Sequence, residues 1–182
     1  NDRTGRFADV TFTHLPWALN GCATHVIAGD LDNDGDNDLV VARGGYCGPK
    51  QQNVVLYNDG QGHLTPLFLP ATPEWTSYVA MGDLNNDGFV DLVFGGNSQP
   101  THVWENHGTS FVDVSGRLPV QSRYALCVAI MDVNKDGWND ILTRGVGGTA
   151  GIRAFVNHGG SSFSLDTTAI EGGANLDVYD LH

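Results

Sequence analysis

One short pattern occurs three times in this chain at a regular interval, and this repetition restricts the fold more than any other feature. Its copies are HVIAGDLDNDGDNDLVVARGG (25–45), YVAMGDLNNDGFVDLVFGGN (78–97) and CVAIMDVNKDGWNDILTRGVGG (127–148). A second pattern follows each copy: NVVLYNDGQGHLTPL (53–67), THVWENHGTSFVDV (101–114) and GIRAFVNHGGSSFSL (151–165). The chain is therefore built from a repeating unit of about 50 residues.

Each unit contains short apolar stretches rich in Val, Ile and Phe, separated by clusters of Asp, Asn and Gly. This alternation predicts four strands joined by hairpins. In the first unit we place the strands near residues 24–29, 38–43, 53–58 and 62–68. The turn between the last two strands contains Asn58-Asp59-Gly60, where Asn and Gly would tolerate the positive φ of a tight hairpin. Asn106 and Asn157 repeat this turn in the later units.

Four antiparallel strands in a repeat of about 40–50 residues indicate an all-β fold made of β-propeller blades. A β-sandwich is the main alternative, but it would not require an Asp-rich loop at the same place in every unit. If the propeller is right, the first strands of successive units should be neighbours around a common axis. We expect a propeller segment of three complete blades with partial blades at both ends. Its predicted units are the end of a partial blade (1–15), three blades (16–70, 71–119 and 120–170) and the start of a partial blade (171–182).

Both ends of the sequence match part of a repeating unit. Asn1 aligns with Asn58, at the turn between the third and fourth strands, and Asp180 aligns with Asp30, which follows the first strand. Propellers need about four to eight blades to close. We therefore expect either a segment of a longer protein or a ring completed by other chains.

Each hairpin between the first and second strands carries Asp-x-[Asp/Asn]-x-Asp-Gly-x-x-Asp, in segments that we call the first (30–38), second (83–91) and third (132–140) aspartate loops. The net charge is −12, with 21 acidic residues and nine Lys plus Arg, which disfavours nucleic acid and favours a cation. We expect one Ca²⁺ in each loop. The predicted ligands are Asp30, Asp32, Asp34, Asp36, Asp38, Asp83, Asn85, Asp87, Phe89, Asp91, Asp132, Asn134, Asp136, Trp138 and Asp140.

Positions are counted from the first Asp of each loop. Oxygen ligands at positions one, three, five and nine, with a glycine at position six, suit Ca²⁺, which takes about six to eight oxygens. Position seven, held by Asp36, Phe89 or Trp138, would supply a backbone carbonyl. An EF-hand is excluded because position twelve is not Glu. Mg²⁺ prefers a strict octahedron, and transition metals prefer His or Cys ligands. The competing interpretation is that Asp, Asn and Gly only form turns here.

Three cysteines leave at least one without an intramolecular partner. Cys22 precedes the first strand and Cys47 follows the second strand of the same unit, so a disulfide between them is expected in an oxidising compartment. The alternative is three free thiols in a cytosolic protein. Cytosolic calcium is low, however, so loops of this kind favour an extracellular location. The sequence contains no apolar run long enough to span a membrane.

The repeats resemble the FG-GAP or VCBS repeats of integrin-type β-propellers, found in integrin α-subunit heads, some fungal lectins and bacterial surface proteins. The resemblance rests on DLDNDGDNDLVV, DLNNDGFVDLVFGG and DVNKDGWNDIL. It implies a seven-bladed architecture with Ca²⁺ in the aspartate loops. The Phe-Gly-Gly-Ala-Pro motif is reduced to Phe94-Gly95-Gly96, which favours a bacterial or other extracellular relative over an integrin homologue.

Hydrolase, zincin and phosphate-loop motifs are missing from the sequence. We therefore expect a non-catalytic extracellular domain, secreted or on the cell surface, that acts in adhesion, surface assembly or recognition of a glycan or protein. The candidate ligand-binding aromatics are Trp17, Tyr46, Trp75 and Trp138. The alternatives are an accessory propeller of a secreted polysaccharide-active enzyme, and a subunit of an extracellular filament completed by neighbouring chains, including copies of itself.

Overall fold

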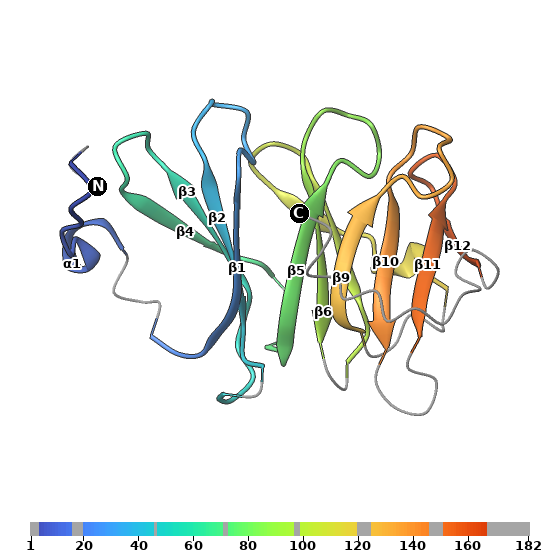
Figure 1. Cartoon of the computed structure of the whole chain (residues 1–182), viewed down its shortest axis with the longest axis horizontal. Helices are drawn as coiled ribbons and strands as arrows, with labels where there is room; N and C mark the ends of the chain where they lie inside the picture. Colours follow the sequence, from blue (N-terminus) through green and yellow to red (C-terminus); the bar gives the residue numbers. More distant parts are fainter. Residues whose placement is uncertain are drawn as a thin grey trace.

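The computed structural model consists of three four-stranded antiparallel sheets with very little helix (Figure 1). The residues that it describes are 4–15, 20–45, 47–70, 73–96, 99–119, 125–145 and 151–166. The predicted all-β, blade-based fold is confirmed. Trp17, Tyr46 and the predicted partial blade 171–182 lie outside the described residues. No helix in the described part is long and apolar enough to cross a membrane.

Each sheet is formed by four strands that are consecutive in the sequence. Blade 1 consists of β1 (Ala23–Gly29), β2 (Asp38–Arg43), β3 (Val54–Asn58) and β4 (Leu64–Phe68). Blade 2 consists of β5 (Thr76–Gly82), β6 (Asp91–Gly96), β7 (His102–Asn106) and β8 (Phe111–Asp113). Blade 3 consists of β9 (Ala125–Met131), β10 (Asp140–Gly145), β11 (Ile152–Asn157) and β12 (Phe163–Asp166). The helical segments are α1 (Thr11–His14) and the 3₁₀ turn η2 (Ser115–Arg117).

The first strands of the three blades are neighbours, because β5 contacts both β1 and β9. Residues of β1, β5 and β9 line one cavity of about 550 Å³. The blades follow one another in a row without closing a ring in the described part of the chain (Figure 1). Successive sheets thus meet at their first strands around a common axis, as in a propeller and not as in a sandwich.

The core lies between neighbouring blades and follows from the two-residue period of a strand. In β6, Leu92 and Phe94 pack into the cluster shared with blade 1. Val93, between them, packs into the cluster shared with blade 3. Both faces of blade 2 are therefore buried, which explains why every residue of β6 is buried.

Two glycines allow the first strands to approach closely. A Cβ at Gly82 would lie 2.7 Å from Ile130 Cγ2, closer than such atoms approach. Gly29 occupies the same place in blade 1 and lies against Met81. The residue at this place in blade 3 is Met131, which is exposed. The last residue of the first strand is thus matched to a particular side chain on the next blade.

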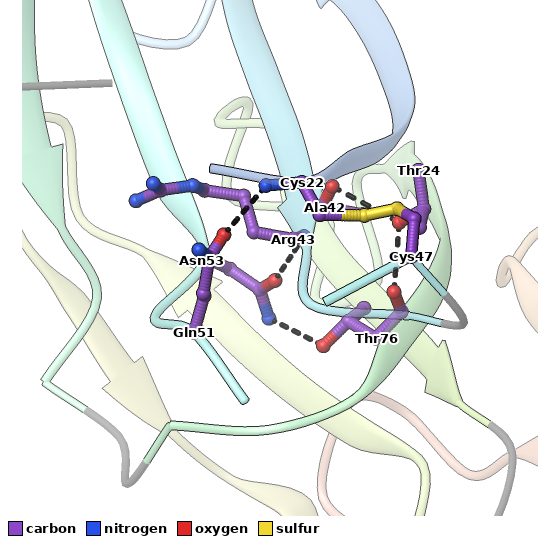
Figure 2. Close-up of a disulfide and its surroundings, with 8 residues drawn as sticks. All are labelled: Cys22, Thr24, Ala42, Arg43, Cys47, Gln51, Asn53 and Thr76. Atoms are coloured by element: carbon purple, nitrogen blue, oxygen red, sulfur yellow. Dashed lines mark hydrogen bonds between the residues drawn. A yellow bond between two sulfur atoms is a disulfide. The ribbon is translucent and has the colours of Figure 1, made fainter. Parts of the chain in front are cut away.

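A covalent and polar network closes the opposite end of blade 1 from the aspartate loops (Figure 2). Cys22 and Cys47 form a disulfide with a Cα–Cα distance of 5.7 Å. Beside it, Thr24 Oγ1 donates to the Thr76 carbonyl at 2.7 Å, and Asn53 Nδ2 donates to Thr76 Oγ1 at 3.0 Å. These bonds join blade 1 to the first residue of β5.

The strand expected over residues 1–15 is not found in the part of that segment that the structure describes. Residues 4–10 have no strand, and Thr11–His14 form a single helical turn. The pattern there matches the last strand of a blade, which in the three described sheets pairs with the third strand of the same blade. A lone strand leaves its backbone N–H and C=O groups unpaired, so the strand propensity of a segment does not by itself make it form a strand.

A half-buried histidine stabilises the connection between blades 1 and 2. Glu74 in this connection exchanges two backbone hydrogen bonds with Gln51, each of 3.0 Å. Nε2 of His102 lies 2.9 Å from Glu74 Oε1, and its Nδ1 lies 3.3 Å from Ser115 Oγ and 4.0 Å from Asp113 Oδ2. The hydrogen bond to Glu74 raises the pKa of His102, and burial opposes this effect.

We predict that His102→Gln makes stability less dependent on pH. Because the folded pKa of His102 is raised, its contribution is fully present below the unfolded value of about 6.5 and is lost as the pH rises through the folded value. The wild type should exceed the variant by about 1–2 kcal/mol near pH 5.5 and by less at alkaline pH. Urea unfolding of both proteins in excess calcium measures this difference, and an equal difference at every pH would contradict the prediction.

Candidate metal centres

The three aspartate loops connect the first and second strands of their blades and lie at the same end of the sheets, the upper edge in Figure 1. Each loop turns sharply because positions four and six have left-handed φ values. These are Asn33 (62°), Gly35 (94°), Asn86 (57°), Gly88 (89°), Lys135 (63°) and Gly137 (89°). Glycine adopts this region freely and Asn tolerates it, whereas Lys135 does so at some cost. The repeated sequence pattern predicted the turn at the glycine but not the left-handed residue at position four.

The polar side chains of each loop bind the backbone of the same loop. The position-one carboxylate accepts the N–H of the glycine: Gly35 N to Asp30 Oδ2 is 3.0 Å, Gly88 N to Asp83 Oδ2 is 3.0 Å and Gly137 N to Asp132 Oδ2 is 2.9 Å. The position-three oxygen accepts the N–H of position five in all three loops. The position-five carboxylate accepts the N–H of position seven. These bonds fix the oxygens of positions one, three and five around the same turn.

The position-nine aspartates, Asp38, Asp91 and Asp140, are fully buried. Their Oδ2 atoms accept the N–H of the second loop residue at 2.8–3.0 Å. Their Oδ1 atoms accept the backbone N–H of the last residue of the third strand, Asn58, Asn106 or Asn157, at 2.8 Å. Each of these carboxylates therefore fastens its loop to the third strand of its own blade.

Burial makes the charged form of these aspartates costly. It raises the pKa of Asp91 to about 6, against the hydrogen bonds from Asn106 and Leu84 that lower it. Burial also raises the pKa of Asp38, and the charges of Asp32 and Asp34 add to this effect. A cation in the loop would offset the desolvation and the mutual repulsion of the carboxylates.

Two carboxylate oxygens provide the test of whether these loops fit a metal ion. Asp30 Oδ1 and Asp83 Oδ1 are buried and have no hydrogen-bond donor among the described residues. In the first loop, Asp30, Asp32 and Asp38 also each bring a carboxylate oxygen within 4.8 Å of the others. A buried anionic oxygen without a donor is costly unless a cation compensates it. This oxygen-only set fits a hard cation such as Ca²⁺.

The third loop differs from the other two at position one. Asp132 Oδ1 accepts the N–H of Lys135 at 2.7 Å and that of Asp136 at 3.2 Å. Its predicted ligand residues Asn134, Asp136 and Asp140 are nevertheless placed as in the second loop, including a bond of 2.9 Å from Asn134 Nδ2 to Asp136 Oδ2. The same bond joins Asn85 to Asp87.

The position-seven side chains lie against the turn between the third and fourth strands. A Cβ at Gly108 would lie 3.2 Å from Phe89 Cε1, and one at Gly159 would lie 3.8 Å from Trp138 Cζ2. Asp36 contacts the equivalent Gly60. The half-buried Trp138 thus packs on its own blade, which leaves less of its ring for a ligand.

Trp75 lies apart from the aspartate loops, just before β5 and therefore at the opposite end of the sheets. Its side chain is 42% exposed, and Lys50 Nζ lies 5.0 Å from the centre of its ring. Its backbone N–H donates to Gln99 Oε1 at 2.8 Å. Trp75 and the aspartate loops therefore form separate candidate sites at opposite ends of the sheets.

The role of Asn58, Asn106 and Asn157 is one that sequence reasoning missed. None of them has a positive φ, so the predicted left-handed conformation was wrong for these residues, and Gly60, Gly108 and Gly159 provide it. Their amide oxygens accept N–H groups within the turn, and their amide nitrogens donate to backbone carbonyls. The signal available in the sequence was an asparagine at the same place in all three units.

We predict that Asp91→Asn lowers the free energy of unfolding by about 2–3 kcal/mol even in calcium-free buffer, because the new amide would face backbone donors that the carboxylate now accepts. The control is Asp87→Asn at the exposed position five, which should cost less than about 1 kcal/mol under the same conditions. Urea unfolding in excess chelator measures both values. Equal losses for the two variants would show that position nine has no special role in the fold.

The comparisons with known proteins agree with this arrangement. A search of curated proteins finds no match to this chain. The model of the FG-GAP-like repeat matches residues 30–94 and 83–143, which include all three aspartate loops. Since these matches cover more than half of the sequence and coincide with the repeated blades, the chain belongs to the FG-GAP-like repeat family.

Proposed function

We propose that this chain is a calcium-stabilised, non-catalytic β-propeller domain of an extracellular protein that acts in adhesion, surface assembly or recognition of a glycan or protein. FG-GAP-like repeats often bind Ca²⁺ and are typically not catalytic, which supports this proposal. The observation that carries the calcium claim is the buried and unpartnered oxygen that occurs at position one of both the first and the second loop.

In the first loop, the carboxylates of Asp30, Asp32, Asp34 and Asp38 and the carbonyl of Asp36 would hold the ion. Asp83, Asn85, Asp87, Phe89 and Asp91 would do so in the second loop, and Asp132, Asn134, Asp136, Trp138 and Asp140 in the third. Bound Ca²⁺ supplies positive charge to a crowded group of carboxylates. The protein's contribution is the backbone N–H groups that already fix one oxygen of most of these side chains.

We predict that calcium raises the melting temperature and that a chelator lowers it. Binding to the folded state alone stabilises by about 2.7 kcal/mol per site when free calcium is about 100 times the Kd. Differential scanning fluorimetry with Asp30→Asn and Asp83→Asn should show a reduced response. The control is Asp59→Asn in a turn outside the loops. A melting temperature that is the same in calcium and in chelator would contradict the proposal.

The proposed extracellular location is supported by the disulfide between Cys22 and Cys47. Disulfides persist mainly in oxidising compartments. Calcium there is also abundant enough for loops that lack the bidentate Glu of an EF-hand. The disulfide and the aspartate loops would thus both depend on the same environment.

The proposed recognition surface lies around Trp75. An exposed indole offers a flat apolar face that stacks on a sugar ring or anchors a protein side chain, and the ammonium of Lys50 adds a hydrogen-bond donor beside it. This surface is separate from the metal loops, so calcium would stabilise the domain without touching the ligand.

We predict that Trp75→Ala removes at least about 90% of binding on a glycan array or to an extracellular protein ligand, a loss of the size expected for a central aromatic contact. Phe7→Ala is the matched control, because Phe7 is also an exposed aromatic side chain, at 82%. Circular dichroism establishes that both variants are folded. Binding by Trp75→Ala equal to that of Phe7→Ala would exclude this surface.

A further inference from the structure

The last residue of the third strand of blades 2 and 3 binds the blade before it. Asn106 Nδ2 donates to the Leu31 carbonyl at 2.6 Å, and Asn157 Nδ2 donates to the Leu84 carbonyl at 2.7 Å. All four residues are buried. These bonds run between different blades, and both acceptors are the second residue of an aspartate loop.

The acceptor residue is central to its own loop. Leu31 lies between the expected ligands Asp30 and Asp32, and its N–H donates to Asp38 Oδ2 at 2.9 Å. Its carbonyl belongs to the peptide group that leads into Asp32. A hydrogen bond to this carbonyl therefore restricts the orientation of ligand-bearing residues in the preceding blade.

The same asparagine also supports the loop of its own blade. The backbone N–H of Asn106 donates to Asp91 Oδ1, and its amide donates to the Val90 carbonyl at 3.1 Å. Asn157 makes the equivalent bonds to Asp140 and Asn139. One buried residue thus touches two successive aspartate loops.

Further bonds join the loops directly. Asn33 Nδ2 donates to the Gly88 carbonyl and Asn86 Nδ2 to the Gly137 carbonyl, each at 3.2 Å. Asn139 Nδ2 donates to the Asp83 carbonyl at 2.8 Å. The first and second loops are therefore joined directly by one hydrogen bond, and the second and third loops by two.

From these contacts we propose that Asn106 and Asn157 couple neighbouring metal loops, so that the calcium affinity of one loop depends on the blade that follows it. This inference rests on the proposed calcium function. The asparagines act as positioning residues, because they hold the backbone of the preceding loop in the arrangement that binds the ion. Calcium binding at one loop should in turn favour ordering of the next, since coupling between binding sites is reciprocal.

The test is a calcium titration of the whole chain followed by NMR, with the amide signals of Gly35, Gly88 and Gly137 each reporting one loop. Asn106→Ser removes the amide donor but keeps a side-chain oxygen at the turn. It should raise the calcium midpoint at Gly35 about 3- to 10-fold, although all ligands of the first loop are unchanged, because the bond between Asn106 and the Leu31 carbonyl is lost.

Asn157→Ser is the matched control, with the same residue type at the same buried place in the repeat. It should raise the midpoint at Gly88 by a similar factor and change that at Gly35 much less, because the bond between Asn106 and the Leu31 carbonyl stays intact. Because each asparagine also contacts the loop of its own blade, the midpoint that tests the coupling is that of the loop in the preceding blade. A wild-type midpoint at Gly35 in Asn106→Ser would overturn the coupling.

A milder variant covers the case in which the buried substitutions prevent folding. Asn33 is exposed and has a left-handed φ, so Asn33→Gly removes only the bond to the Gly88 carbonyl. It should raise the midpoint at Gly88 about twofold. Lys135→Gly, at the same position of the third loop, should leave Gly88 unchanged; equal effects of both variants on Gly88 would count against the coupling.

The failure of the two proposals can be distinguished. If none of the three glycine signals responds to calcium in the wild type, the calcium function fails and the coupling fails with it. If all three respond and the Asn106→Ser and Asn157→Ser variants change only their own loops, calcium binding stands and the coupling alone is wrong.

Discussion

The buried carboxylate at position nine of each aspartate loop is the interaction on which the rest of the blade depends. Asp38, Asp91 and Asp140 each accept one N–H from the start of their loop and one from the end of the third strand. The loop thus takes its shape only when three strands are already side by side. The geometry of the candidate metal centre therefore depends on contacts with the rest of the blade and not on the turn alone.

Most of the fold could be predicted because clusters of Asp, Asn and Gly mark the ends of the strands in the sequence. The expected strands near 24–29 and 38–43 agree closely with β1 and β2, since Asp and Gly clusters interrupt apolar runs at both ends. The segment 1–15 shows the limit of this reasoning. Its turn and strand pattern is similar to that of the complete blades, yet a strand also needs a partner, and a local pattern does not contain one.

The candidate site could be predicted only where its chemistry is local. The spacing of oxygens along one loop is visible in the sequence, but the role of Asn106 is not, because its acceptor Leu31 is 75 residues away. Trp138 was predicted as a ligand-binding aromatic, and the fold places it near Gly159 of its own blade. Contacts with distant segments, in the same blade for Trp138 and in the preceding blade for Asn106, determine the roles of these residues, and the local sequence pattern does not contain those contacts.

The close approach of Gly29 to Met81, and of Gly82 to Ile130, means that the blades are not interchangeable units. A larger residue occupies this place in blade 3, where Met131 stands. If blade 3 were duplicated, Met131 of the first copy would meet the β-branched Ile130 of the second, at a contact that now accommodates a glycine. The order of the repeats is thus encoded in side-chain size, and duplication or shuffling of such blades would require compensating changes at this single contact.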